Sequence, residues 1–412
     1  MSKKIKLLVS PSDTLGVGHF RSIWPAQTIQ RLYSDEFDLD INGLVSIKDI
    51  EYLKKFDIIH FHRNLGPYEE FNNLSKILKE NGTILIMDID DWWYPPSTHP
   101  MYEMVLRDKL AEKIENGLLH SDYATTTTSL FAKKIKLINP NVEVLPNALD
   151  LNSKMWNSEN TKKSDKVRIA WIGGSSHYND LLQLKESMAM LYKAEDLRGK
   201  FQVVLCGFDT RGTITTLMPD NTSIVRKTSP QESIWNNFER ILTNDYLGID
   251  DKNYVKWLQS IKREKYLNEY DQSYVRRWTL PMTQYAKHYD FADICLAPLA
   301  ETEDKKINNV NVKVLNTFNY VKSEVKIIEA GIKNKTLIAQ DFGIYNQLLS
   351  EDMGILVNNN KNGWYKAIRK LILEKDLRQQ MAQNLHNYVI KNYSLEYITK
   401  KRVDFYKRIL KK

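Results

Sequence analysis

Short apolar segments that read as buried strands recur along the chain, and segments with helical spacing separate most of them. Strands that alternate with helices build parallel sheets from βαβ units. A polar stretch without periodicity, residues 146–166, divides the segments into two series. The predicted strands of the first series are 5–10, 39–44, 57–62, 83–89, 122–128 and 142–145; those of the second are 167–173, 201–207, 223–225, 292–297, 336–339 and 354–357.

The two series predict an α/β protein with two doubly wound, Rossmann-like domains, since 412 residues exceed one core of usual size. The expected parts are an N-terminal domain (1–150), a linker (151–166), a C-terminal domain (167–391) and a last helix (392–412). Helices are predicted at 103–118, 364–391 and 394–411, and the stretch 231–290 is predicted to be mostly helical. Ligands of such sheets bind at the C-terminal ends of the strands, so we expect the chemistry in a cleft between the two sets of ends.

Composition indicates a soluble globular protein, with 42% hydrophobic and 27% charged residues. No apolar run approaches the ~18 residues of a membrane span, and the N-terminal run "IKLLV" is too short for a signal peptide. Cys206 and Cys295 lie inside predicted strands without ligand spacing. We therefore expect a reduced, cytoplasmic protein without a disulfide or zinc framework.

The net charge of +8 is unevenly distributed. Residues 1–150 carry 17 Lys+Arg against 21 Asp+Glu, whereas residues 391–412 carry eight against two. A solvated basic helix is one interpretation of the last segment. The other is a surface that attracts the phosphates of a nucleotide, an anionic membrane or a polymer.

A glycine-containing loop follows the first strand of each series. Gly16 and Gly18 follow the strand 5–10, with Arg21 one turn into the next helix. Gly173 ends the strand 167–173, and Gly174 and Ser175 follow it. Glycines in such loops let a phosphate approach the backbone, and the amides of the following helix can bind it. A tight strand-to-helix turn explains either loop alone, but two at matching positions favour ligand binding.

Histidines and aspartates gather at the ends of two further strands. His60 and His62 share one face of their strand, which suggests a metal site, but no third ligand is evident nearby. We predict that His60 is a core residue and that His62 lies at the strand end, where catalytic and sugar-binding groups gather. Asp88, Asp90 and Asp91 either hold a metal and a diphosphate or simply end a strand and cap a turn.

Glu329 lies beside an apolar stripe in a predicted helix that begins with Ser323 as N-cap and Glu324 in the first turn and exits at Gly331. A packed helix would prefer an aliphatic residue at 329. We expect an uncompensated carboxylate there, so Glu329→Ala should leave stability unchanged or slightly raised. If Glu329 is instead a structural residue paired inside the fold, the same change should unfold the protein.

Seven segments, in order, resemble GT-B glycosyltransferases of the large retaining group that includes sucrose synthase and the phosphatidylinositol mannosyltransferases. The bacterial and phage "glycosyltransferase group 1" proteins are the closer resemblance. The segments are Gly16–Gly18 with Arg21 and Pro25, Phe61–Arg63, Asp88–Asp91, Thr125–Thr128, Leu145–Asn147, Ile172–Gly174 and Lys322–Gly331. Singly these motifs are weak, but together they span nearly the whole chain.

The resemblance implies the GT-B fold, with two Rossmann-like domains facing a central cleft and the last helix packed back on the first domain. It also implies that Glu329 binds the ribose hydroxyls of a nucleotide sugar, while Lys322 and the backbone around Ser323 face the diphosphate. Gly16, Gly18, Gly173, Gly174 and Ser175 complete the implied donor contacts.

His62 is the implied catalytic residue, placed to hold a sugar hydroxyl or the acceptor. Arg21, Arg63, Asp90 and Asp91 are candidates for the acceptor side or the cleft. No cofactor or metal is implied, and positioning with charge stabilisation of the departing diphosphate would supply catalysis.

One family residue is missing. The group pairs two glutamates eight positions apart, and Val321 stands where the first would be. Asn319, Lys322 or Glu324 could substitute.

The favoured hypothesis is a retaining transfer of a sugar from a nucleotide diphosphate sugar to an envelope glycan or lipid-linked glycan, with peripheral contact to the inner face of the membrane. A phage DNA-modifying glycosyltransferase is second, and weak DNA affinity is expected because residues 1–150 have a net charge of −4. A nucleotide-sugar epimerase or hydrolase and a non-catalytic binding module remain as alternatives.

Overall fold

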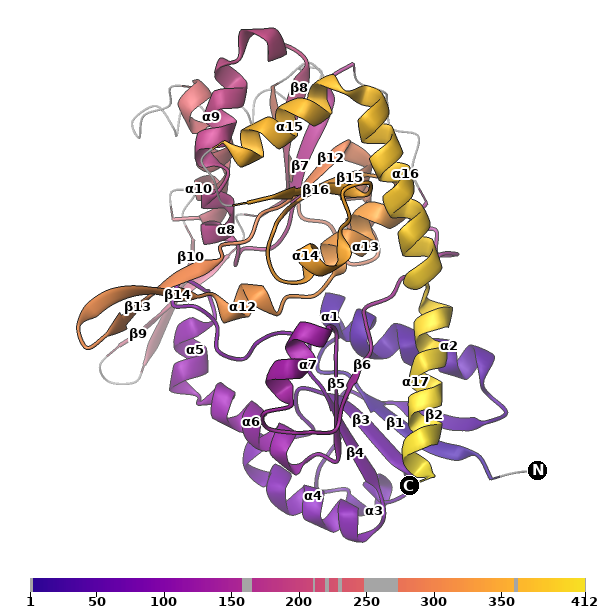
Figure 1. Ribbon diagram of the computed structural model, residues 1–412. Helices are drawn as coiled ribbons and strands as arrows, with labels where there is room; N and C mark the ends of the chain where they lie inside the picture. Colours follow the sequence, from indigo (N-terminus) through magenta and orange to yellow (C-terminus); the bar gives the residue numbers. More distant parts are fainter. Residues whose placement is uncertain are drawn as a thin grey trace. The chain divides into compact units, whose positions relative to one another are not determined.

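The computed structural model describes residues 3–157, 165–209, 212–218, 222–228, 232–247, 273–358 and 362–411 (Figure 1). The chain forms two compact units. The first unit comprises Met1–Ser153, Glu301–Ile328 and Tyr388–Lys412, and the second comprises Lys154–Ala300 and Glu329–Asn387. This division differs from the predicted boundaries, because 301–328 belongs to the first unit. Of the predicted linker, 158–164 lies outside the described residues.

The first unit contains one parallel sheet with the strand order β2-β1-β3-β4-β5-β6. Its strands are β1 (Ile5–Ser10), β2 (Phe37–Ile41), β3 (Ile58–His62), β4 (Ile84–Asp88), β5 (Tyr123–Thr126) and β6 (Val142–Val144). All six predicted strands of the first series are present, with boundaries shifted by a few residues. β2 lies on one side of β1, and β3 to β6 follow on the other side. The position between β1 and β3 is therefore the topological switch point.

Helices cover both faces of this sheet (Figure 1). Side chains alternate along the strands: Leu8, Ile59 and Phe61 belong to one apolar cluster, and Leu7 and Val9 belong to another. The helical segments of the first unit are α1 (Gly16–Gly18), the π-helix η1 (His19–Ile23), α2 (Trp24–Leu32), α3 (Ile50–Leu53), η2 (Tyr68–Glu70), α4 (Phe71–Glu80), α5 (Tyr102–Arg107), α6 (Leu110–His120), α7 (Ser129–Ile135), α12 (Thr317–Tyr320) and α17 (Leu395–Leu410).

The predicted helix 103–118 is divided into α5 and α6. Lys109, between them, has a left-handed φ of 50°, which a continuous helix cannot accommodate. The predicted last helix is correct. Ser394 is the N-cap of α17, and its side chain accepts a hydrogen bond from the amide of Tyr397. The helix packs Val403, Phe405 and Tyr406 into the cluster that contains Leu7. The C-terminal helix thus packs on the N-terminal sheet, as expected.

The second unit contains another parallel sheet, with the order β11-β8-β7-β12-β15-β16. Its strands are β7 (Val167–Ile172), β8 (Phe201–Phe208), β11 (Tyr274–Trp278), β12 (Ile294–Ala297), β15 (Thr336–Gln340) and β16 (Gly354–Val357). β11 lies within 231–290, so the prediction of a mostly helical stretch is wrong there, and residues 248–272 lie outside the described ranges. The order reverses between β7 and β12, at the matching switch point.

The helical segments of the second unit are α8 (Tyr178–Leu182), α9 (Lys185–Lys193), η3 (Glu195–Leu197), α10 (Ile234–Leu247), the 3-10 helix η5 (Tyr285–Phe291), α14 (Ile344–Leu348) and α15 (Gly363–Leu373). Two helices, α13 (Val325–Ile332) and α16 (Lys375–Asn392), run from one unit into the other. The predicted helix 364–391 therefore appears as α15 and α16, interrupted at Glu374.

Two antiparallel hairpins were not predicted. β13 (Thr302–Ile307) and β14 (Val310–Leu315) belong to the first unit, and β9 (Thr213–Leu217) and β10 (Ser223–Lys227) belong to the second. The prediction of 223–225 as a strand of the parallel sheet is wrong, because these residues pair only with β9 among the described strands. None of the helices in the described ranges is long and apolar enough to cross a membrane.

The start and exit of α13 differ from the prediction. The helix begins at Val325, so Glu324 rather than Ser323 precedes its first residue. It continues through Gly331 to Ile332, and the residue with a left-handed φ is Asn334, at 52°. Asparagine adopts this conformation more readily than most residues and here replaces glycine at the helix exit.

Candidate active site

Polar residues of the first unit meet at the C-terminal ends of its parallel strands. Ser12 follows β1, His62 ends β3, and Asp90 follows β4 by two residues. Ser12 and His62 therefore flank the switch point between β1 and β3, where ligands of doubly wound sheets bind. Ser12 is exposed, whereas the His62 side chain has no exposed surface.

Both ring nitrogens of His62 are engaged. Nε2 lies 2.8 Å from Oδ1 of Asp90, and Nδ1 lies 2.6 Å from Oγ of Ser12. An ionised carboxylate only accepts, so Nε2 carries a proton and donates it to Asp90. In the neutral ring Nδ1 accepts from the Ser12 hydroxyl; in the imidazolium Nδ1 donates to Ser12, whose hydroxyl then turns to Oδ2 of Asp13, 3.1 Å away. Ser12 is the member of this chain that solvent reaches.

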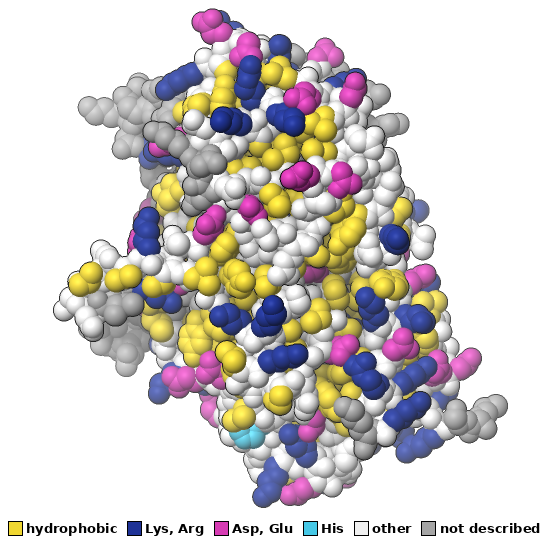
Figure 2. All heavy atoms as spheres, viewed as in Figure 1, with side chains coloured by type: hydrophobic (Ala, Val, Ile, Leu, Met, Phe, Trp, Pro, Cys, Tyr) yellow, Lys and Arg dark blue, Asp and Glu magenta, His cyan; other side chains and the backbone are white. Residues whose placement is uncertain are grey.

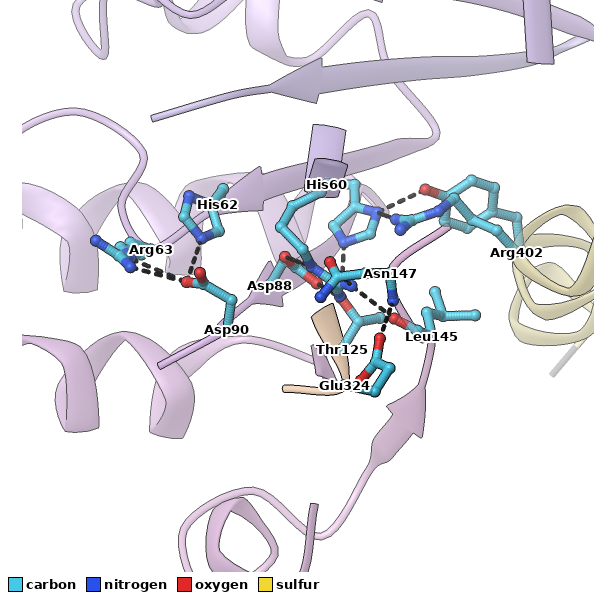
Figure 3. A network of polar contacts seen from close by, with 12 residues as sticks. His60, His62, Arg63, Asp88, Asp90, Thr125, Leu145, Asn147, Glu324 and Arg402 are labelled. Atoms are coloured by element: carbon cyan, nitrogen blue, oxygen red, sulfur yellow. Dashed lines mark hydrogen bonds and ion pairs between the residues drawn. The ribbon is translucent and has the colours of Figure 1, made fainter. Parts of the chain in front are cut away.

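Asp90 also binds Arg63, which fixes its carboxylate (Figure 3). Nε and Nη2 of Arg63 donate to the same Oδ1 over 3.2 and 2.9 Å. Burial alone would raise the pKa of Asp90, but the charges of Arg63 and His62 and their hydrogen bonds hold it well below its usual range. Arg63 has a φ of 63°, and strain of this kind in a non-glycine residue is typical of functional sites. Asp91 is farther away, 3.9 Å from Arg63.

A second network begins at Arg21, in the π-helix η1. Its guanidinium makes a bidentate ion pair with Asp88, with Nη2 2.7 Å from Oδ1 and Nε 3.0 Å from Oδ2. Nη1 donates to the carbonyl of Leu145 and to Oδ1 of Asn147. Burial alone would raise the pKa of Asp88, but the charge and hydrogen bonds of Arg21 lower it well below its usual range. Both side chains are buried, so Arg21 is an internal cation and not an exposed acceptor contact.

The network continues from Asp88 to α17 through a chain of hydrogen bonds (Figure 3). The Thr125 hydroxyl donates to Asp88 over 2.5 Å, and Nε2 of His60 lies 2.9 Å from that hydroxyl. Nδ1 of His60 accepts from Arg402, 3.2 Å away, because arginine can only donate. Burial and the charge of Arg402 lower the pKa of His60 well below its ordinary value. His60 is thus a neutral core histidine, as predicted.

Glu324 joins the network from the segment 301–328. Its Oε1 accepts the backbone amide of Asn147 over 2.7 Å, and the side chain is buried. Burial raises the pKa of Glu324 to about 7, although hydrogen bonds from backbone amides and the charge of Arg21 act against it. A buried carboxylate that ionises near neutral pH makes stability depend on pH.

Glu324→Gln should reduce this dependence between about pH 5 and 8. The folded-state pKa lies above the unfolded value of about 4.3, so the folded protein binds more protons than the unfolded chain in this window and loses stability as the pH rises. Glutamine keeps an oxygen for the Asn147 amide without a charge. We expect the variant to resemble wild type near pH 5 and to exceed its free energy of unfolding by roughly 2–3 kcal/mol at pH 8, measured by urea unfolding.

Comparing Glu324→Gln with wild type cancels the stability contributions of the other groups that titrate between about pH 5 and 8. His60 is one of them, and its lowered pKa acts in the opposite direction in both proteins. The charge of Arg21, which interacts with Glu324, is also unchanged. Wild-type and variant stabilities that run parallel from pH 5 to 8 would show that Glu324 is not the group responsible.

Gly18 serves the packing of its own loop. A Cβ at Gly18 would lie 1.8 Å from the carbonyl oxygen of Asp13, so no side chain fits. The Asp13 carboxylate accepts the amides of Leu15 and Gly18 over 2.8 and 3.1 Å. This geometry supports the alternative of a tight strand-to-helix turn for Gly16–Gly18, with the first helical amides bound by Asp13.

The matching loop of the second unit is more open. A Cβ at Gly173 would meet the Trp171 ring at 2.6 Å, whereas a Cβ at Gly174 would have no neighbour within 4 Å, and Ser175 is exposed. Beyond the loop, Asp180 accepts the amide of Ala300 over 2.7 Å, and Ala300 follows β12. Asp180 therefore connects the two segments that flank the second switch point, between β7 and β12.

Glu329 is buried but not uncompensated. Its two oxygens accept the hydroxyls of Tyr285 and Tyr289, both on η5, over 2.6 and 2.5 Å. Burial and the Glu329 charge raise the pKa of both tyrosines well above its ordinary value. The expectation that Glu329→Ala would leave stability unchanged is therefore corrected, because the change would remove the acceptor of two tyrosine hydroxyls.

The remaining predicted donor residues, Lys322 and Ser323, lie in the first unit and are half-buried. Nζ of Lys322 lies 4.3 Å from the centre of the Phe318 ring. Val321 is fully buried in the apolar cluster that contains Phe61. A core residue thus stands where the group that the sequence resembles has its first glutamate.

The structure brings His62, Arg63 and Asp90 together and places Arg21 in a neighbouring buried network. The residues that the sequence analysis missed are Ser12, Asp13, Tyr285 and Tyr289. Ser12 and Asp13 follow a predicted strand directly, which was an available signal. Among the described residues no group of three or more His, Cys, Asp or Glu could hold a metal, and Asp88 and Asp90 each bind an arginine.

No protein-family model matches the chain, and no curated protein sequence matches it. Solved structures do match it along its whole length. Sucrose-phosphate synthase from Thermosynechococcus elongatus is 12% identical with a TM-score of 0.59, covering 99% of both chains. A glycosyltransferase from Rickettsia africae is 14% identical with a TM-score of 0.59, covering 100% of both chains. HepE from Anabaena, in complex with UDP and glucose, is 10% identical with a TM-score of 0.57, covering 98% of this chain and 100% of that one.

At these identities the similarity establishes the fold. Each unit has the doubly wound sheet described above, and the similarity includes both. The protein therefore has the GT-B glycosyltransferase fold.

Proposed function

We propose that the protein is a glycosyltransferase that moves a sugar from a nucleoside diphosphate sugar to a hydroxyl acceptor with retention of configuration. The observation that carries the proposal is the similarity of nearly the whole chain to sucrose-phosphate synthase and to HepE bound to UDP and glucose. A similarity to one domain would support only nucleotide binding, since Rossmann-like domains serve many functions.

The Ser12–His62–Asp90 chain supports an acceptor site in the first unit. An acceptor hydroxyl can donate to Oγ of Ser12 while the Ser12 hydroxyl donates to Nδ1 of His62. Asp90 and Arg63 keep the imidazole in the tautomer that accepts from Ser12. In the transfer, the bond between the anomeric carbon and the diphosphate oxygen breaks, a bond to the acceptor oxygen forms, and the leaving diphosphate takes the acceptor proton. The Ser12–His62–Asp90 chain contributes by orienting the acceptor hydroxyl.

The second unit supports donor binding. The open backbone at Gly174 and the exposed Ser175 lie at the switch point between β7 and β12, where a diphosphate can approach the amides. Glu329 is the proposed ribose contact. The carboxylate accepts the hydroxyls of Tyr285 and Tyr289, and a carboxylate can accept more than two hydrogen bonds.

Glu329→Gln should weaken nucleoside diphosphate binding at least tenfold. Each hydrogen bond from a ribose hydroxyl to the charged carboxylate contributes on the order of 1.5–3 kcal/mol, and the neutral amide loses most of this. Glutamine is similar in size and can still bond with Tyr285 and Tyr289, so the folded protein remains measurable. Isothermal titration with UDP, GDP and ADP tests the prediction.

Tyr289→Phe is the matched control, because it removes one partner of Glu329 and leaves the carboxylate. It should cost about 1.5–3 kcal/mol of stability and leave nucleotide affinity within about twofold of wild type. If Glu329→Gln binds nucleotide as tightly as wild type, Glu329 is only the structural partner of the two tyrosines.

Product analysis separates the proposed function from its alternatives. The protein is incubated with UDP-, GDP- and ADP-sugars, with and without saccharide acceptors, and the products are identified by mass spectrometry. Sugar transfer supports the proposal; conversion without an acceptor indicates an epimerase or hydrolase; no turnover with tight nucleotide binding indicates a binding module.

The ion pairs of the basic C-terminal helix make DNA a less favoured acceptor than a glycan. Lys407 of α17 pairs with Glu36, and Arg408 pairs with Glu143 over 2.6 Å. These pairs reduce the charge available to DNA phosphates. A tight gel shift with duplex DNA that weakens steeply with salt would reverse this order.

A further inference from the structure

The hairpin β13–β14 and helix α5, both in the first unit, enclose a pocket of about 520 Å³. This volume lies within the range of small-ligand sites. Aromatic and apolar side chains, Tyr94, Tyr102 and Leu106, line one part of it, and the hairpin contributes polar side chains that include Glu303, Lys305 and Asn311. Figure 2 shows hydrophobic and charged side chains together on the surface over this hairpin.

The ring of Tyr94 is exposed and yet held in place. It is 44% exposed, and its ring packs on Trp92 and Trp93 with centroid distances of 5.9 and 6.5 Å. Burial and the neighbouring Glu115 raise the pKa of its hydroxyl. Nε1 of Trp93 donates to the same Glu115 over 3.0 Å. A ring fixed in this way loses little conformational entropy when a flat apolar surface stacks on it.

The charges that line the pocket cancel. The hairpin supplies two acidic residues, Glu303 and Asp304, and two basic ones, Lys305 and Lys306, and Glu303 pairs with Lys305 over 3.1 Å. A polyanion would require a net positive lining. A neutral ligand with hydroxyl groups and an apolar face fits better, because the carboxylates and Asn311 can bond hydroxyls while an aromatic ring covers the C–H face.

We propose that this pocket binds a neutral saccharide and is the subsite that holds the acceptor glycan. Tyr94 follows Asp90 by four residues. The segment after β4 therefore carries both Asp90, of the Ser12–His62–Asp90 chain, and Tyr94, which lines the pocket. The assignment as an acceptor subsite rests on the proposed transferase function; saccharide binding by itself does not.

The test is saturation-transfer NMR and titration with maltotriose, cellotriose and chitotriose, with a sulfated disaccharide as the anionic probe. At least one neutral trisaccharide should bind, and the sulfated probe should not compete with it. Tyr94→Ala should weaken trisaccharide binding by about fivefold or more, and Asn311→Ala, on the exposed hairpin, should weaken it without affecting the fold. Tyr397→Ala is the matched control, because Tyr397 is equally exposed on α17.

Each result decides one question. If no neutral trisaccharide binds, if the sulfated probe binds more tightly, or if Tyr397→Ala has the same effect as Tyr94→Ala, the pocket proposal is wrong. UDP titration of the same variants separates this outcome from failure of the proposed function, because nucleotide binding should be unchanged in all of them. Trisaccharide binding without sugar transfer would retain the saccharide site and remove its role as acceptor subsite.

Discussion

Arg21→Met should lower the free energy of unfolding by about 3–5 kcal/mol, because it leaves the buried carboxylate of Asp88 without its cation. The variant also leaves the carbonyl of Leu145 without its 2.7 Å donor. Methionine keeps much of the volume of the arginine stem, so the loss reports the charge more than a cavity. Urea unfolding at pH 7, followed by circular dichroism, measures the difference.

The pH dependence of this loss identifies its cause. In wild type the folded-state pKa of Asp88 lies below the unfolded value, so its stabilising contribution is present at neutral pH and is lost as the pH falls through the folded value. Without Arg21, burial raises the pKa of Asp88, and protonation removes the uncompensated charge. The deficit of Arg21→Met should therefore shrink from pH 7 to pH 4, and adding Asp88→Asn should recover part of it at pH 7. A loss below about 1 kcal/mol at pH 7 would contradict this account.

Asp90→Asn should lower kcat by about 10²-fold under the proposed function, because the Ser12–His62–Asp90 chain orients the acceptor. The Asp90 carboxylate keeps the proton of His62 on Nε2, which leaves Nδ1 to accept from Ser12. Asparagine can donate through its amide and so stabilise the opposite tautomer, in which Nδ1 no longer accepts. Because Asp90 acts through His62, the pH profile of kcat/KM should also shift, which a purely structural role would not produce.

Asp91→Asn is the matched control for this change. Asp91 adjoins Asp90 in sequence, but its carboxylate is 42% exposed and 3.9 Å from Arg63. Asp91→Asn should change kcat by less than about threefold, because an exposed ion pair contributes little. Thermal melting of both variants should show a folded protein. Equal losses of activity in the two variants would assign the effect to charge in this segment and not to the position of His62.

The fold was largely predictable because most of the parallel strands are apolar runs bounded by polar residues. The strands that were missed lack this signal. β11, "YVRRW", carries two arginines, one of which pairs with the buried Glu239 over 2.9 Å. β13 and β14 are polar and exposed, and their signal was the pair Asn308–Asn309 between alternating residues, which forms a two-residue turn with positive φ at both positions.

The site was predictable as a set of strand ends but not as a set of contacts. The sequence places His62 and Asp90 after neighbouring strands, and parallel pairing of β3 with β4 then brings them together. Nothing local shows that Ser12 occupies the other ring nitrogen of His62, because the contact depends on β1 pairing with β3. The partners of Glu329 were likewise hidden, since η5 lies 40 residues and more from it in sequence.

The release of nucleoside diphosphate from UDP-, GDP- and ADP-sugars, followed over time with and without a saccharide acceptor, tests the central claim most directly. The account predicts release from at least one donor, stimulated by the acceptor in wild type and nearly abolished in Asp90→Asn but not in Asp91→Asn. Release that is equal without acceptor and insensitive to Asp90→Asn, or no release from any donor, would contradict it.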